Sequence, residues 1–159
     1  MIAVIQRVKR ASVAIDGKIS GQCEKGLMIL LGVVDGDCES DAEALAAKIS
    51  KLRIFCDDEG KMNLSVKDVG GEMVIVSNFT LLANYVKGNR PDYFGAAAPD
   101  EADRLYEYFC SLVDGQIKHV GRGIFGADME INMTCDGPVT IVMDSNVLLR
   151  KKESDGEGK

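Results

Sequence analysis

Residues 134–145 read Thr134-Cys135-Asp136-Gly137-Pro138-Val139-Thr140-Ile141-Val142-Met143-Asp144-Ser145, and apolar side chains alternate with polar ones on both sides of the Asp-Gly-Pro. Such alternation is typical of strands that bury one face. Because Asp-Gly favours a tight turn, the pattern predicts two strands joined by a hairpin. Pro138 is unusual here, since it removes a backbone donor where strand pairing would begin. The simpler interpretation is a plain turn. The functional one is that Gly137 and Pro138 present two carbonyls with little side chain around them.

The rest of the sequence predicts more strands than helices. Apolar runs and alternation indicate strands at residues 2–8, 12–15, 19–23, 27–34, 73–76, 117–120 and 129–133, with a hairpin at Asp16-Gly17. Two amphipathic helices are expected, one capped by Asp35-Gly36-Asp37 and one opened by Pro99. Strands in runs with only two main helices favour an α+β fold, a single domain with a largely antiparallel sheet or a partly closed barrel.

The composition is that of a globular protein, with 46% hydrophobic and 28% charged residues among 159. We expect one domain over residues 1–149 and a flexible charged tail over residues 150–159. The longest apolar run, residues 27–31, is too short to cross a membrane, and the first residues show no basic leader. The sequence therefore predicts a cytoplasmic protein without a membrane partner.

Charge and cysteine content narrow the possible functions. The net charge of −6 argues against broad nucleic-acid binding, but it allows one folded RNA to bind through a local basic patch. The five cysteines (23, 38, 56, 110 and 135) lack paired spacing, which indicates free thiols in a reducing compartment. With His119 as the one histidine there is no zinc pattern, and no Walker loop or dinucleotide fingerprint occurs. We expect neither a metal nor a cofactor.

Two polar stretches are candidates for chemistry. Ser77-Asn78-Phe79-Thr80-Leu81 follows the strand predicted at 73–76, so it would bring hydroxyls and an amide to the sheet edge; the alternative is that these groups satisfy local backbone atoms. Lys87-Gly88-Asn89-Arg90-Pro91 is followed by Tyr93 and Phe94. Cations beside aromatics suit phosphate contact and base stacking, although a solvated loop explains the composition equally well.

Six blocks in order make the sequence resemble the D-aminoacyl-tRNA deacylases from Met1 to Ser145. They are Val4-Ile5-Gln6-Arg7-Val8, Gly60-Lys61-Met62-Asn63-Leu64-Ser65, residues 77–81, residues 87–91, Phe125-Gly126-Ala127-Asp128-Met129 and residues 136–140. The resemblance implies a homodimeric, tRNA-binding proofreading hydrolase of translation that acts on RNA and not on DNA. It would cleave the ester of D-aminoacyl-tRNA, and of glycine mischarged on the alanine tRNA, and reject L-aminoacyl-tRNA.

The resemblance also assigns roles to single residues. The Gly137-Pro138 bond is expected to be cis, and the pair to enter the other subunit's active site, where its carbonyls exclude an L side chain. Arg7 would hold this pair in place. The remaining assignments are Ser77, Asn78, Phe79 and Thr80 for catalysis, Phe125 and Met129 for the substrate pocket, and Lys87 and Arg90 for tRNA contact. Because no base lies near Thr80 in the sequence, we favour an orienting role for it, with the RNA's own hydroxyl or a water attacking the ester.

Two positions depart from the family pattern, which has Gln at the place of Asn78 and Asn at the place of Cys135. Both changes bear on fine geometry and rate more than on the reaction class. They leave two rival functions open: a noncatalytic RNA-binding module on the same fold, and a cysteine hydrolase that uses Cys135.

Overall fold

The computed structural model describes residues 1–149, and its sheet is organised around the long strand β1 (Ile2–Ile15). On one side β1 pairs antiparallel with β8 (Glu130–Asp144). On the other side it pairs first with β3 (Gly26–Gly32) and then with β2 (Lys18–Cys23), again antiparallel. One continuous strand therefore connects three others.

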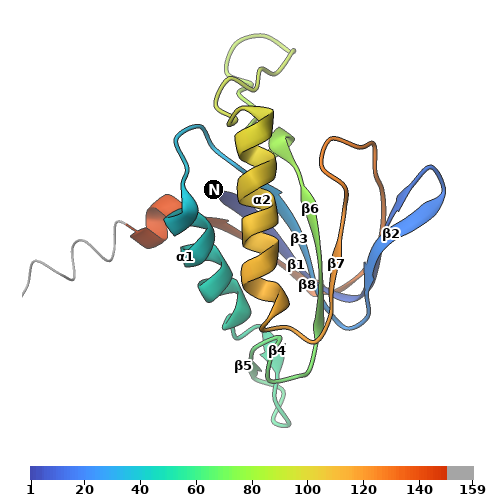
Figure 1. Ribbon diagram of the computed structural model, residues 1–159. Coiled ribbons are helices and arrows are strands. Elements are labelled where there is room, and N and C mark those ends of the chain that lie inside the picture. Colours follow the sequence, from blue (N-terminus) through green and yellow to red (C-terminus); the bar gives the residue numbers. More distant parts are fainter. Residues whose placement is uncertain (150–159) are drawn as a thin grey trace, which may run out of the picture.

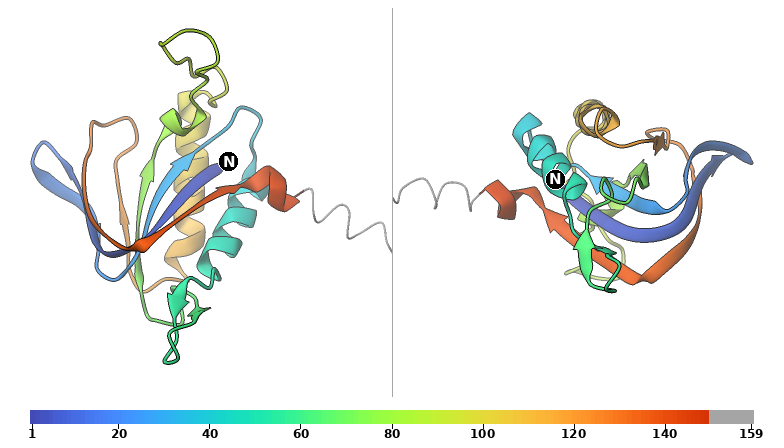
Figure 2. Two further views of the ribbon diagram at one scale, coloured as in Figure 1. Left: turned by 180° about the vertical axis from the view of Figure 1, so that it is seen from behind. Right: turned by 90° about the horizontal axis from the view of Figure 1, so that it is seen from below.

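The sheet continues beyond β3 and then curls back. β6 (Glu72–Ser77) pairs parallel with β3, and β7 (Val120–Arg122) pairs parallel with β6. The outer strands β2 and β7 approach so closely that a Cβ on Gly21 would lie 2.4 Å from the backbone nitrogen of Arg122, so only glycine fits there. The mixed sheet is thus nearly closed into a barrel, as Figure 2 shows, and the predicted α+β fold is confirmed.

Two helices, α1 (Glu39–Ser50) and α2 (Pro99–Asp114), cover one face of the sheet (Figure 1). Their buried stripes recur every three or four residues and pack on the inward side chains of β1, β3 and β6 to form the main core. A smaller core fills the other face of the sheet, around Val8, Val13, Met28, Val74 and Val76. The predicted helix start at Pro99 is confirmed.

Short elements complete the chain. β4 (Phe55–Cys56) and β5 (Met62–Leu64) form a small hairpin after α1, and the 3₁₀ helix η1 (Phe79–Leu82) follows β6. All five cysteines are free, as predicted. Within residues 1–149, no helix has the length and apolar character needed to cross a membrane. The predicted tail, residues 150–159, lies outside the described residues.

The predicted hairpin at Asp136-Gly137 is wrong. β8 runs in one direction throughout, and both of its halves pair with β1. Gln6 lies opposite Thr140 and Val8 lies opposite Cys135, so residues 136–139 bulge out of the strand opposite Arg7. The physical reason is nonlocal: β1 is long enough to pair with both halves of β8, whereas a reversal would leave half of that edge unpaired.

Three smaller predictions are also corrected. The strands predicted at 2–8 and 12–15 are one strand, β1. The N-cap of α1 is Cys38, because the Asp41 carboxylate accepts from the Cys38 N–H, while Asp37 is used elsewhere. β7 begins at Val120, later than predicted, since the N–H groups of Gln116 and Ile117 still bond to the end of α2.

Candidate active site

An open pocket of about 870 Å³ lies where β3 and β6 end and α2 begins. Its walls are mainly apolar and include Leu31, Val76 and Ala102. Ser77, Asn78 and Phe79 from the end of β6 and start of η1 line it together with Phe125 and Met129 from the segment after β7. The structure therefore brings five of the predicted site residues into one pocket.

Thr80 follows Phe79 in η1 but is not among the residues that line the pocket, and it is hydrogen-bonded to Asn78. The Asn78 Oδ1 accepts hydrogen bonds from both the backbone N–H and the hydroxyl of Thr80, the former at 3.2 Å. Asn78 also caps η1. An amide oxygen fixes the direction of a hydroxyl, but it does not remove its proton as a general base would. The local structure suits an orienting hydroxyl rather than a nucleophile.

Aromatic side chains form the outer rim of the pocket. The rings of Phe79 and Tyr93 meet edge to face with centroids 5.0 Å apart, which ties η1 to the segment before α2. Phe94, which also lines the pocket, is 91% exposed. On the inner side, Phe125 lies against the buried Tyr106, whose hydroxyl donates to the Ile75 carbonyl at 2.9 Å.

The Gly137-Pro138 peptide bond is cis, as expected, and it lies in the β8 bulge. Arg7, only 9% exposed, holds the start of this bulge. Its Nε donates to the Asp136 carbonyl at 3.1 Å and lies 3.1 Å from the Asp136 carboxylate. Its Nη1 donates to the Ile54 carbonyl at 2.5 Å. Arg7 therefore connects the bulge to the segment that follows α1.

The structure does not bring the Gly-Pro segment (Gly137–Pro138) to the pocket of its own chain. Arg7, which contacts the bulge, pairs with Leu27, whereas the pocket reaches β3 at Leu30 and Leu31. Leu30, the nearer of these two lining residues, is three positions from Leu27 along β3, about 10 Å at the usual rise per residue. Neither Gly137 nor Pro138 is among the residues that line the pocket.

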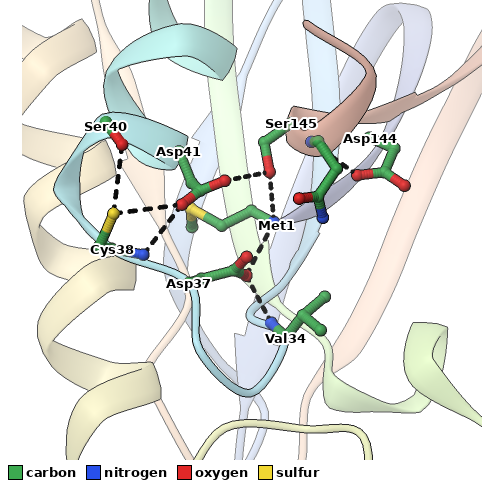
Figure 3. A network of polar contacts seen from close by, with 9 residues as sticks. Met1, Val34, Asp37, Cys38, Ser40, Asp41, Asp144 and Ser145 are labelled. Carbon is green, nitrogen blue, oxygen red and sulfur yellow. Dashed lines mark hydrogen bonds and ion pairs between the residues drawn. The ribbon is translucent and has the colours of Figure 1, made fainter. Parts of the chain in front are cut away.

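A polar network that sequence reasoning missed supports one pocket wall (Figure 3). The α-amine of Met1 is fully buried, lies 2.7 Å from the Asp37 carboxylate and donates to the Ser145 hydroxyl. Asp37 also accepts from the Val34 N–H at 2.6 Å. The neighbouring Val33 lines the pocket, and its carbonyl accepts from the N–H of Ala97, another wall residue. No spacing in the sequence links residues 1, 37 and 145.

Asp41 belongs to the same network. The Ser145 hydroxyl donates to its carboxylate at 2.7 Å. Burial alone would raise the pKa of Asp41, but hydrogen bonds from the Cys38 N–H and the Ser145 hydroxyl, with the nearby α-ammonium, keep this pKa below its ordinary value. The carboxylate therefore remains charged where it joins α1 to the end of β8.

Lys87 and Arg90 lie outside the pocket, in an exposed loop that begins at Asn84 and ends at Asp92. Cys135 also lies apart from the pocket lining. It is exposed on β8, and its thiol donates to the Gln6 side-chain oxygen at 3.5 Å. An amide oxygen does not generate a thiolate, so this site lacks the base that a cysteine nucleophile needs.

Comparisons with known proteins give consistent matches. The profile of the family described as D-Tyr-tRNA(Tyr) deacylase matches residues 4–144. A D-aminoacyl-tRNA deacylase of Caldicellulosiruptor saccharolyticus is 53% identical over 145 residues, 91% of this chain and 97% of the relative. One of Porphyromonas gingivalis is 51% identical over 147 residues, 92% of this chain and 98% of the relative.

Two solved structures share the fold. One is described as c-Myc DNA Unwinding Element Binding Protein; it has a TM-score of 0.85 and 37% identity and covers 91% of this chain and 98% of its own. The other, described as a probable eukaryotic D-amino acid tRNA deacylase, has a TM-score of 0.78 over 90% of this chain and 98% of its own. At 16% identity, the second shows the fold alone.

Proposed function

The chain belongs to the D-Tyr-tRNA(Tyr) deacylase family and hydrolyses the ester bond of D-aminoacyl-tRNA, and we propose that this ester is cleaved in the pocket at the ends of β3 and β6. The observation that carries the proposal is that Ser77, Asn78 and Phe79 line the same pocket as Phe125 and Met129. Charged tRNA is a cytoplasmic substrate, so the cytoplasm is the proposed site of action.

Catalysis in this proposal depends on positioning. The N–H of Phe79 makes no hydrogen bond within residues 1–149, so it is available to the oxyanion that forms when the ester carbonyl is attacked. Thr80, oriented by Asn78, directs its hydroxyl oxygen toward the substrate. The attacking group is a water or the terminal ribose hydroxyl, since the ester is already activated and needs only alignment.

Selectivity for the D configuration is assigned to the Gly-Pro segment of a second subunit. Two backbone carbonyls close to the α-carbon would collide with an L side chain, whereas a D side chain points away and glycine has none. The proposal therefore includes glycyl-tRNA(Ala) as a substrate. The absence of Gly137 and Pro138 from the lining of their own chain's pocket supports a contribution in trans.

The surface of β8 supports the homodimer that this assignment requires. Within residues 1–149, β8 pairs with β1 alone and leaves its other edge open. Met133 is 41% exposed and Val142 is 67% exposed on this strand. A two-fold contact would cover such apolar side chains on both copies at once and carry both Gly-Pro segments into the facing subunits.

A deacylation assay tests the proposed selectivity. We expect rapid cleavage of D-tyrosyl-tRNA and of glycyl-tRNA(Ala), and sparing of L-tyrosyl-tRNA under the same conditions. Equal cleavage of D- and L-tyrosyl-tRNA would refute the proposal. Tight tRNA binding without turnover of any ester would favour the rival RNA-binding module, and loss of activity in Cys135→Ala would favour the cysteine hydrolase.

Mixed dimers test whether selectivity acts in trans. Gly137→Ala alters the Gly-Pro segment, because Gly137 has φ +139° and an added Cβ would lie 2.6 Å from the Val139 nitrogen. Ala96→Trp fills the pocket. In a dimer of these two variants, the one open pocket faces the unchanged Gly-Pro segment of the other subunit.

We expect this mixed dimer to spare L-tyrosyl-tRNA, while the Gly137→Ala homodimer cleaves it. Equal cleavage of L-tyrosyl-tRNA by both would show that each segment acts within its own chain. A monomer that retains full activity and selectivity at micromolar concentration would exclude the dimer altogether.

A further inference from the structure

The loop between η1 and α2 stands out from the body of the protein (Figure 1). Its base is fixed: Asn84 and Asp92 exchange two backbone hydrogen bonds, of 2.8 and 3.0 Å, and their side chains bond at 3.0 Å. Gly88, with φ +71°, turns the chain at the tip. The loop is therefore a projection with a defined stem rather than a structureless connection.

The side chains on this projection are unusual for a solvated loop. Tyr85 is 77% exposed and Val86 is 84% exposed. Lys87 and Arg90 are exposed as well, and neither forms an ion pair with any carboxylate in the part of the chain that the structure describes. Large apolar side chains left in water beside free cations indicate a surface that binds a partner.

The position of the loop indicates which class of molecule binds to it. Tyr93 and Phe94 follow directly after the stem and line the pocket rim. An RNA whose terminal ester lies in the pocket must leave over this rim, and the nucleotides next to the ester are single-stranded. Single-stranded nucleic acids bind where aromatic rings stack on bases and cations contact the phosphates. With a net charge of −6, the protein needs such a local site to attract RNA.

We propose that Tyr85 stacks on a base of the single-stranded 3′ end of the tRNA, upstream of the terminal adenosine, while Lys87 and Arg90 contact the adjoining phosphates. The inference rests on the pocket proposed above as the ester site. It adds a second recognition surface, which senses the RNA strand and not the amino acid.

The experiment compares two substrates of the same enzyme: full-length D-tyrosyl-tRNA, and a minimal D-tyrosyl ester of adenosine that lacks every upstream nucleotide. The measured quantity is the ratio of kcat/KM for the tRNA to kcat/KM for the minimal ester. We expect Tyr85→Ala to lower this ratio on the order of ten-fold, the usual effect of losing one stacked base. Tyr85→Phe keeps the ring and should keep the ratio.

Ile19→Ala provides a matched control, because Ile19 is a 57% exposed apolar residue on β2, outside the pocket lining. Its ratio should equal that of the wild type. An unchanged ratio in Tyr85→Ala would overturn the inference. A change from dimer to monomer in Tyr85→Ala would also overturn the inference, because it would show that the loop is a subunit contact. Failure of the wild type to cleave the minimal ester would instead count against the pocket as the ester site.

Discussion

Replacing Arg7 by methionine should destabilise the protein and loosen the bulge that carries the Gly-Pro segment. Methionine keeps an unbranched apolar stem in the buried space, but it removes the guanidinium that donates to the Ile54 and Asp136 carbonyls. The Ile54 residue is only 6% exposed, so water cannot easily replace the lost donor. Leaving these two acceptors unpaired should cost about 2–4 kcal/mol of unfolding free energy.

The Asp136 carboxylate should matter less than its carbonyl. Its side chain is 35% exposed, so solvent screens the ion pair with Arg7, and Asp136→Asn should cost about 1 kcal/mol or less. Both variants should lower the ratio of D- to L-tyrosyl-tRNA cleavage, Arg7→Met more strongly, because it frees the backbone at the start of the bulge.

Urea unfolding measures the loss of unfolding free energy in the two variants. The protein concentration is held fixed, since the stability of the proposed dimer would depend on it. The cleavage ratio is measured in the same preparations. A loss below about 0.5 kcal/mol in Arg7→Met, or an equal loss in both variants, would refute the reasoning. The first result would mean that water reaches the two carbonyls and replaces the lost donor. The second would mean that the ion pair contributes more to stability than the hydrogen bonds to the carbonyls.

Three further predictions follow from the site and its surroundings. Thr80→Val should lower kcat on the order of 10²-fold, as loss of one positioning group does; complete inactivity, or a covalent aminoacyl adduct on Thr80 in mass spectra, would contradict this. Replacing Lys87 and Arg90 together by alanine should raise KM for charged tRNA and reduce the slope of log(kcat/KM) against log salt by about 1.4, the value for two lost phosphate contacts of a single strand; an unchanged slope would show that the contacts lie elsewhere. Because the folded-state pKa of Asp41 is lowered, its contribution to stability is fully present above the ordinary Asp pKa of about 3.9 and is lost as the pH falls through the lower folded value; urea unfolding between pH 5 and pH 2 should therefore show a weaker pH dependence in Asp41→Asn than in the wild type.

Local signals in the sequence were sufficient for the elements whose cause is local. Pro99 opens α2 because its fixed φ and missing N–H suit a first helical turn. The buried run before Ser77 predicts β6, and the change to polar residues after it correctly places Ser77 and Asn78 at a rim. Each of these features depends on residues that are close to it in the sequence.

Features that depend on distant partners were not predictable in this way. Asp136-Gly137 has the local chemistry of a hairpin, and only the length of β1 makes it a bulge. The contact between the Met1 amine and Ser145 joins residues 144 positions apart, and no periodicity points to it. The roles proposed for Arg7 and the Gly-Pro segment rest on the family resemblance. Nothing near Arg7 in the sequence indicates that its guanidinium donates to the Ile54 carbonyl.

The bulge in β8 also limits how this sequence can change over evolutionary time. Val139 at the end of the bulge and Ile141 and Met143 after it pack toward the main core, while residues 130–134 before it are held in register with β1. An insertion or deletion of one residue between 136 and 139 would have to be absorbed within the bulge, because a slip of one position would turn those three side chains outward. The length of this segment is thus constrained by the strand on each side, and the φ of +139° at Gly137 constrains the residue at that position as well.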